Sequence, residues 1–186
     1  MSVLLCSEIL IAIYRFLPLL QNRLYMAKLY INKDIVADKD KMENWYLTGE
    51  EGLSFPDIQN FLSWIDPNDH VIDIEIHSCG GDAVEGYAIY DALRASGKQI
   101  SCTAVGRCAS MATVILLAAA KERRFAYPHA KFLIHKPYMA SYDGDLDLET
   151  LESIKSNLES EKNKMLALYV ERTGSEASVI EAQMNK

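Results

Sequence analysis

Ser110 stands at the start of a long apolar run, in the segment RCASMATVILLAAA of residues 107–120. A serine at a helix start is a preferred N-cap, because its oxygen can accept a hydrogen bond from an amide of the first turn. The same hydroxyl, if it points outward, can act as a nucleophile, and the N–H of the next residue can then help to bind an oxyanion. The spacing is not the GxSxG of a nucleophile elbow. The pattern alone favours the cap.

His135 follows an apolar strand, KFLI, and comes directly before Lys-Pro. An imidazole can take the proton from a serine hydroxyl and return it to a leaving group. A position at a strand end, before a loop that contains proline, favours a side chain that faces a cleft. A single histidine is nevertheless more often structural, and the residue types alone leave both interpretations open.

Two segments, IHSCGGDAVEG and AVGRCASMA, each end a strand in a glycine-containing turn that leads directly into a helix. Ligands of α/β folds tend to bind at the carboxyl ends of strands. A Gly-Gly turn leaves backbone N–H groups unobstructed, so it can receive an anion or a developing oxyanion. Each turn alone is explained as well by ordinary tight-turn geometry, which is the favoured interpretation.

The composition predicts one folded domain, or one domain with an appendage, and neither a metal nor an organic cofactor is expected. The chain has 186 residues, of which 49% are hydrophobic and 24% charged, so it can form a core. A net charge of −7 argues against a nucleic-acid or anionic-membrane surface. The four cysteines lack CxxC spacing, which favours a reducing compartment and a cytoplasmic location. The four histidines are too dispersed for a zinc motif.

Residues 1–25 form an apolar N-terminal extension that needs its own explanation. Within VLLCSEILIAIYRFLPLL, residues 3–20, the residues Glu8, Arg15 and Pro18 argue against a membrane-spanning helix. Three interpretations remain: an amphipathic helix for self-association, a weak membrane-surface segment, or a translated stretch upstream of the true start. Because Met26 opens a natural strand, MAKLYINKDI, the third is favoured.

From Lys28 onward, strand and helix patterns alternate. Strands are expected at residues 28–36, 70–78 and 99–106, with a pair of short strands at 123–128 and 130–135. Helices are expected at 54–65, 83–96, after Ser110, and at 146–172, and the polar segment 38–53 is expected to be turn-rich. This alternation predicts an α/β fold with a largely parallel sheet and flanking helices.

Three blocks together resemble the Clp-type serine peptidases, which have the ClpP/crotonase-like fold. They are IHSCGGDAVEGYAIYDAL, GRCASMATVILLAAA and KFLIHKP, in the family's order and spacing. The resemblance runs from about Val71 to Lys186, and more loosely from Lys28. It implies a Clp-type peptidase domain over residues 26–186.

The resemblance also implies roles for individual residues. Ser110 would be the nucleophile and His135 the general base, while Gly81 and Met111 would supply oxyanion-hole N–H groups. Substrate would lie along the segment PYMASYDGD as an added strand. The implied substrate-binding residues are Gly80, Pro137, Tyr138 and Met139. The long helix from Leu146 would be the handle through which subunits pair across homo-oligomeric rings.

The chain departs from the family pattern at three points. Cys79 stands where proline is usual, and His77 where asparagine is common. The family's acidic triad residue is expected one position beyond Lys186, which implies a truncated and severely impaired chain. Loss of that acid costs about 10⁴ in turnover in the template serine protease. Asp143, Asp145 and Asp147 are weak substitutes.

The compact opening, KLYINKDIVADK through VIDIEIHSCGGD, resembles most closely the phage-type Clp peptidases that process capsid or scaffold proteins during head maturation. Expected partners are therefore peptide or protein substrates, further copies of the chain, and either an AAA+ unfoldase or phage capsid proteins. Nucleic acid and membrane are not expected. The alternatives are a catalytically impaired Clp-like scaffold protein and, less favoured, an acyl-CoA hydratase-like enzyme.

Overall fold

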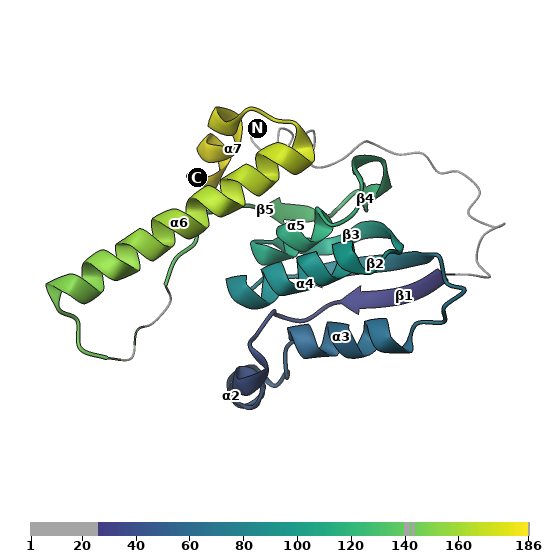
Figure 1. The fold of residues 1–186 in the computed structure, drawn as a ribbon, viewed down its shortest axis with the longest axis horizontal. Helices are drawn as coiled ribbons and strands as arrows, with labels where there is room; N and C mark the ends of the chain where they lie inside the picture. The colour runs from purple at the N-terminus through teal and green to yellow at the C-terminus, as the bar shows by residue number, and fades with distance from the viewer. Residues whose placement is uncertain (1–25, 140–141, 143, 186) are drawn as a thin grey trace. The chain divides into compact units, whose positions relative to one another are not determined.

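The computed structural model describes residues 26–139, 142 and 144–185 (Figure 1). The expected N-terminal extension, residues 1–25, lies outside the described residues. The chain divides into two compact units, one ending at Leu133 and the other beginning at Ile134, and each is described by itself. In the described part of the chain, no helix has both the length and the apolar character that crossing a membrane requires.

The first unit contains a five-stranded sheet in which every described pairing is parallel. β1 (Met26–Ile31), β2 (Val71–Ser78) and β3 (Gln99–Ala109) lie side by side in that order. β4 (Arg124–Ala126) and β5 (Lys131–Leu133) both pair with β3, at different points along it. The predicted parallel α/β fold is thus confirmed, although the two short strands pair with β3 and not with each other.

The alternating sequence pattern of β2 reflects the burial of one of its faces. In β2 the isoleucines at 72, 74 and 76 have no exposed surface, while the residues between them are half-buried. A strand with period-two alternation of this kind places one face in the core. β1 ends at Ile31, although the strand was expected to reach residue 36. Ile35 lies outside the strand and forms isolated bridges with Leu53 and Gly81.

Three helices of the first unit pack close to the sheet. α4 (Ala83–Ala95) lies between α3 (Phe55–Trp64) and α5 (Met111–Leu116) (Figure 1). All six residues of α5 are buried, which accounts for the unbroken apolar run after Ser110. Two short 3-10 helices, η1 (Asp38–Asp40) and η2 (Lys121–Arg123), also belong to the unit.

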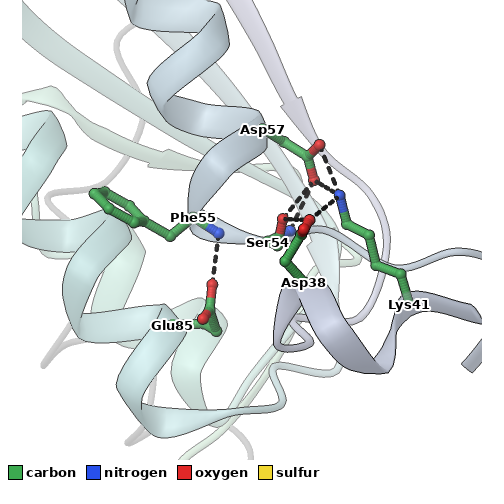
Figure 2. Close-up of polar contacts among 6 residues, drawn as sticks. All are labelled: Asp38, Lys41, Ser54, Phe55, Asp57 and Glu85. Carbon is green, nitrogen blue, oxygen red and sulfur yellow. Dashed lines mark hydrogen bonds and ion pairs between the residues drawn. The ribbon is translucent and has the colours of Figure 1, made fainter.

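A polar cluster fixes the start of α3 (Figure 2). Ser54 and Asp57 form a capping box, with the Ser54 N–H donating to Asp57 Oδ2 over 2.8 Å. Lys41 belongs to the same cluster and forms ion pairs with Asp38 and Asp57 (Figure 2). The Phe55 N–H donates to Glu85 over 2.6 Å, which connects the start of α3 to α4. The helix start expected at Ser54 is therefore confirmed.

The segment 38–53 is not only turns, as expected, because it contains the helix α2 (Lys41–Thr48). No residue of α2 is buried, although Met42, Trp45 and Tyr46 lie at helical spacing, which the expectation of turns did not take into account. Gly49 ends it in the left-handed conformation, at φ 81°.

The second unit consists of the loop that begins at Ile134 and two helices, α6 (Leu148–Thr173) and α7 (Ala177–Met184). Asp147 caps α6 by accepting the Thr150 N–H, and Gly174 ends it at φ 74°. These bounds confirm the long helix expected at 146–172 within two residues at each end. Lys162 of α6 forms an ion pair with Glu181 of α7.

Candidate active site

The backbone of Ser110 has an unusual conformation. Its φ is 53° and its ψ is −128°, and it is the single non-glycine residue with positive φ in the described part of the chain. Such a conformation costs about 1–3 kcal/mol in a residue with a side chain. Ser110 occupies the N-cap position of α5, yet its side chain makes no capping hydrogen bond. The capping interpretation therefore does not hold, and the half-buried hydroxyl is left available.

The residues Ser78–Asp82, here called the glycine turn, are held on both sides. The buried Ser78 side chain accepts the Gly80 N–H over 3.0 Å. Ile35 donates its N–H to the Gly80 carbonyl and accepts the Asp82 N–H, each over 2.8 Å. In such a parallel bridge the intervening residue directs its own N–H and C=O to the opposite side. The Gly81 N–H therefore points away from Ile35.

Gly80 brings the glycine turn against the backbone around Ser110. A Cβ at Gly80 would lie 2.6 Å from the Ala109 carbonyl oxygen and 2.7 Å from both the Met111 nitrogen and Ser110 Cβ. The φ values of 88° at Gly80 and 142° at Gly81 also favour glycine. Close approach of the two backbone segments thus requires a residue without a side chain.

Two backbone amides next to Ser110 are left without acceptors. Met111 is the first residue of α5, so its N–H has no acceptor within the helix. Neither this N–H nor that of Gly81 donates a hydrogen bond to another described residue. Paired free N–H groups beside a hydroxyl are the arrangement that stabilises an oxyanion during acyl transfer.

β5 holds the backbone at Ser110. The Ser110 N–H donates to the Leu133 carbonyl over 2.8 Å, and β5 pairs in register with Arg107–Ala109 of β3. His135 is the second residue after Leu133 along the chain, just beyond the strand in which it was expected. The structure therefore brings together Ser110, Met111, Gly80 and Gly81 in the first unit, whereas His135 belongs to the second.

Within the second unit, the imidazole of His135 has two neighbours. Its Nδ1 lies 2.7 Å from the Lys136 carbonyl oxygen. Its ring centroid is 5.5 Å from that of Tyr138, at an interplanar angle of 43°. Tyr138 and Met139 are exposed and Pro137 is half-buried, as a segment that receives substrate would need to be. Of the weak substitute acids, Asp143 lies outside the described residues and Asp147 caps α6.

His77 and Cys79, which depart from the family pattern, both contact Arg107. The His77 Nδ1 accepts the Arg107 N–H over 3.3 Å, and the Arg107 guanidinium donates to Cys79 Sγ over 3.0 Å. The Cys79 sulfur holds the pKa of Arg107 above its usual value. These contacts hold the irregular stretch between β2 and β3, where the register shifts after Ile76.

The buried thiols are unsuited to nucleophilic chemistry. Burial raises the pKa of Cys102 to about 12, and it also raises the pKa of Cys108. Among residues 26–139, 142 and 144–185, no group of three or more His, Cys, Asp or Glu side chains is arranged to hold a metal ion.

Sequence reasoning missed two contributors to the site, Ser78 and the Leu133 carbonyl. A serine two residues before a glycine can accept that residue's N–H, so the Ser-Cys-Gly order contained a usable indication for Ser78. The Leu133 contact depends on strand pairing between distant segments, which no local pattern shows.

Comparisons with known proteins show similarity to one family. A model of the Clp protease family matches residues 57–186. The ATP-dependent Clp protease proteolytic subunit 1 of Chlamydia muridarum is 32% identical over 130 residues, which cover 68% of this chain and 65% of the relative. A proteolytic subunit from Porphyromonas gingivalis is 37% identical over 102 residues, which cover 53% of this chain and 46% of the relative.

The fold also matches a solved structure. A ClpP1 mutant from Listeria monocytogenes aligns with a TM-score of 0.66 and 20% sequence identity, over 87% of this chain and 80% of that one. The chain spans about 65% of the length of the chlamydial relative. With a family match over most of its residues and the same fold, the chain belongs to the Clp protease family.

Proposed function

We propose that this chain is a serine endopeptidase of the Clp type, which cleaves peptide bonds through an acyl-enzyme on Ser110. The observation that carries the proposal is the conformation of Ser110. The residue is held at φ 53° without a capping hydrogen bond, beside the free amides of Gly81 and Met111. Stored backbone strain of this kind is concentrated at functional sites.

In the proposed reaction, Ser110 Oγ attacks the substrate carbonyl carbon while His135 takes the hydroxyl proton. The Gly81 and Met111 N–H groups bind the oxyanion of the tetrahedral intermediate. His135 then gives the proton to the leaving amine, and the C–N bond breaks. Water, deprotonated by His135, releases the acyl group from Ser110 in the same manner. The third triad residue remains an expectation from the family resemblance.

Chain connectivity supports the role of His135. The hydrogen bond from the Ser110 N–H to the Leu133 carbonyl fixes the end of β5, and His135 follows two residues later. Two residues of extended chain span at most about 7 Å. Only two residues of chain thus separate the proposed general base from the strand end that contacts the nucleophile.

The substrate is proposed to lie against Gly80 and the segment from Pro137 to Met139, with main-chain hydrogen bonds to an extended peptide. Assembly into homo-oligomeric rings is proposed through α6, because Leu148 and Leu151 near its start are 81% and 47% exposed. The names of the bacterial relatives include ATP dependence, which favours an AAA+ unfoldase as partner over phage capsid proteins. A cytoplasmic location and a head-maturation substrate remain predictions.

The test is labelling with a serine-reactive fluorophosphonate, followed by peptide mass mapping. We expect one label per chain on Ser110, none in Ser110→Ala, and a rate at least about 10³-fold lower in His135→Ala. Ser156→Ala, at an exposed serine of α6, is the matched control and should label as the original chain does. If labelling survives in Ser110→Ala, or if neither the folded chain nor a form extended to the natural stop codon labels, the peptidase proposal is wrong. The scaffold protein or, if CoA binds, the acyl-CoA enzyme would then be favoured.

A further inference from the structure

The Thr113 side chain lies in the first turn of α5 and contacts the backbone of the proposed nucleophile. Thr113 has no exposed surface, and its hydroxyl donates to the Ser110 carbonyl over 2.6 Å. The Thr113 N–H donates to the same oxygen over 2.9 Å. On its other side, Ser110 donates its N–H to the Leu133 carbonyl over 2.8 Å. These hydrogen bonds hold the backbone of Ser110 in its strained conformation, at φ 53°.

The Ser110 carbonyl and the Met111 N–H belong to one peptide unit. A trans peptide is planar, so its C=O and N–H bonds point in opposite directions, and the described part of the chain contains no cis peptide. Because the carbonyl is directed at Thr113, the Met111 N–H points away from it. A Cβ at Gly80 would lie 2.7 Å from the Met111 nitrogen, so the glycine turn lies close to this nitrogen. The direction of a proposed oxyanion-hole amide is thus coupled to the Thr113 hydroxyl.

A threonine in a helix often donates to a carbonyl three or four residues earlier, which does no more than satisfy its hydroxyl. Thr173 of α6 is such a case, because its hydroxyl donates over 2.7 Å to the carbonyl of Tyr169, within the same helix. The acceptor of Thr113 differs, because Ser110 precedes α5 and has a strained backbone. A strained conformation persists only where the surrounding contacts fix it. The Thr113 hydroxyl is one of the groups that fix it here.

We propose that Thr113 is a positioning residue whose hydroxyl holds the Ser110–Met111 peptide so that the Met111 N–H faces the substrate oxyanion. In Thr113→Val the backbone N–H at 113 still binds the Ser110 carbonyl, but the second hydrogen bond is lost and the strained peptide rotates. An amide that is turned away stabilises the transition state less, whereas binding of the substrate is little changed. The catalytic consequence rests on the proposed function, but the effect on the peptide does not.

The first measurement is the rate of fluorophosphonate labelling of Ser110 as a function of probe concentration. Complete loss of one oxyanion-hole donor costs about 10²–10³-fold, so we expect the saturating rate of Thr113→Val to fall by about 10–100-fold. The half-saturating probe concentration should change by less than about threefold. Thr113→Ser keeps the hydroxyl and should label within about threefold of the original chain. Labelling of Thr113→Val at the original rate, or labelling of Thr113→Ser as slow as that of Thr113→Val, would overturn the positioning role.

The matched control is Thr173→Val, which removes the same kind of hydroxyl bond from another buried threonine. Urea unfolding should show that both valine variants lose a similar amount of stability, because each loses one buried hydrogen bond. Thr173→Val should nevertheless label within about twofold of the original chain. Equal slowing in both variants would mean that lost stability is the cause, and it would overturn the proposal. If circular dichroism shows that Thr113→Val is unfolded, Thr113→Ala removes the same hydroxyl and carries the same expectations.

The second measurement is a crystal structure of unreacted Thr113→Val, which does not depend on activity. We expect the Ser110–Met111 peptide to be rotated and Ser110 to have left the conformation at φ 53°. An unchanged peptide would overturn the positioning role. If the peptide rotates but neither the original chain nor its extended form labels, the proposed function is wrong while the coupling to Thr113 stands. If the original chain labels and Thr113→Val labels equally fast, the peptidase stands and the positioning role is wrong.

Discussion

Replacing Ser110 by glycine should stabilise the fold, although it removes the hydroxyl. At φ 53° and ψ −128°, any side chain at this position strains the backbone. Glycine adopts positive φ without that cost. Replacement by alanine keeps the strain and removes only the hydroxyl, so the two variants separate the conformational effect from the chemical one.

The magnitude follows from two opposing terms. Relief of the strained conformation is worth about 1–3 kcal/mol. Glycine increases the conformational entropy of the unfolded chain, which costs about 0.4–1 kcal/mol relative to alanine. We therefore expect Ser110→Gly to be more stable than Ser110→Ala by about 0.5–2 kcal/mol, or about 2–4 °C in Tm for each kcal/mol. Because the hydroxyl makes no capping bond, Ser110→Ala itself should stay within about 0.5 kcal/mol of the original chain.

Urea unfolding at one fixed protein concentration measures these differences, since self-association would otherwise shift the apparent stability. Neither variant should label with fluorophosphonate. A serine cap would give the opposite stability pattern, with Ser110→Ala destabilised by about 0.5–2 kcal/mol and glycine offering no gain. That result would refute the strained-nucleophile interpretation.

Three further predictions test other parts of the structure. Gly80→Ala should leave the chain folded but slow Ser110 labelling by at least about 10²-fold, because the added Cβ would lie 2.6–2.7 Å from the backbone around Ser110; labelling at the original rate would contradict the close approach. Iodoacetamide at about pH 8 should alkylate exposed Cys79 but not Cys102, whose pKa burial raises to about 12; mass spectrometry that finds both modified would show that the core is open. Burial opposes the charge of Asp57, but hydrogen bonds from Lys41 and Ser54 outweigh it and lower the Asp57 pKa. Lys41→Met should therefore cost about 1 kcal/mol in urea unfolding at pH 7, and this difference should shrink as the pH falls from about 4 through the lowered pKa of Asp57; a difference that did not change with pH would contradict the ion pair.

Local patterns were sufficient for the main elements of the fold. The alternation of Val71–Ile76 predicts a strand with one buried face, and β2 has that face. Ser54 before an apolar pattern at helical spacing predicts a helix start, and α3 begins at Phe55. The apolar stripe ending at Thr173-Gly174 predicts the long helix that α6 forms. Each of these depends on interactions between residues close in sequence, or on burial of one face.

The rest depends on distant contacts that no local pattern shows. The conformation of Ser110 results from β5 pairing with β3 and from the close approach of Gly80. The residue type at 110 is compatible with a cap or a nucleophile, and only the backbone geometry distinguishes them.

The most direct test of the central claim is a crystal structure of the chain after reaction with a fluorophosphonate. The account predicts phosphorus bonded to Ser110 Oγ, with the phosphoryl oxygen about 2.7–3.1 Å from the amide nitrogens of both Gly81 and Met111. An adduct on another residue would contradict the assignment of the nucleophile. A phosphoryl oxygen directed away from both amides would contradict the assignment of the oxyanion hole.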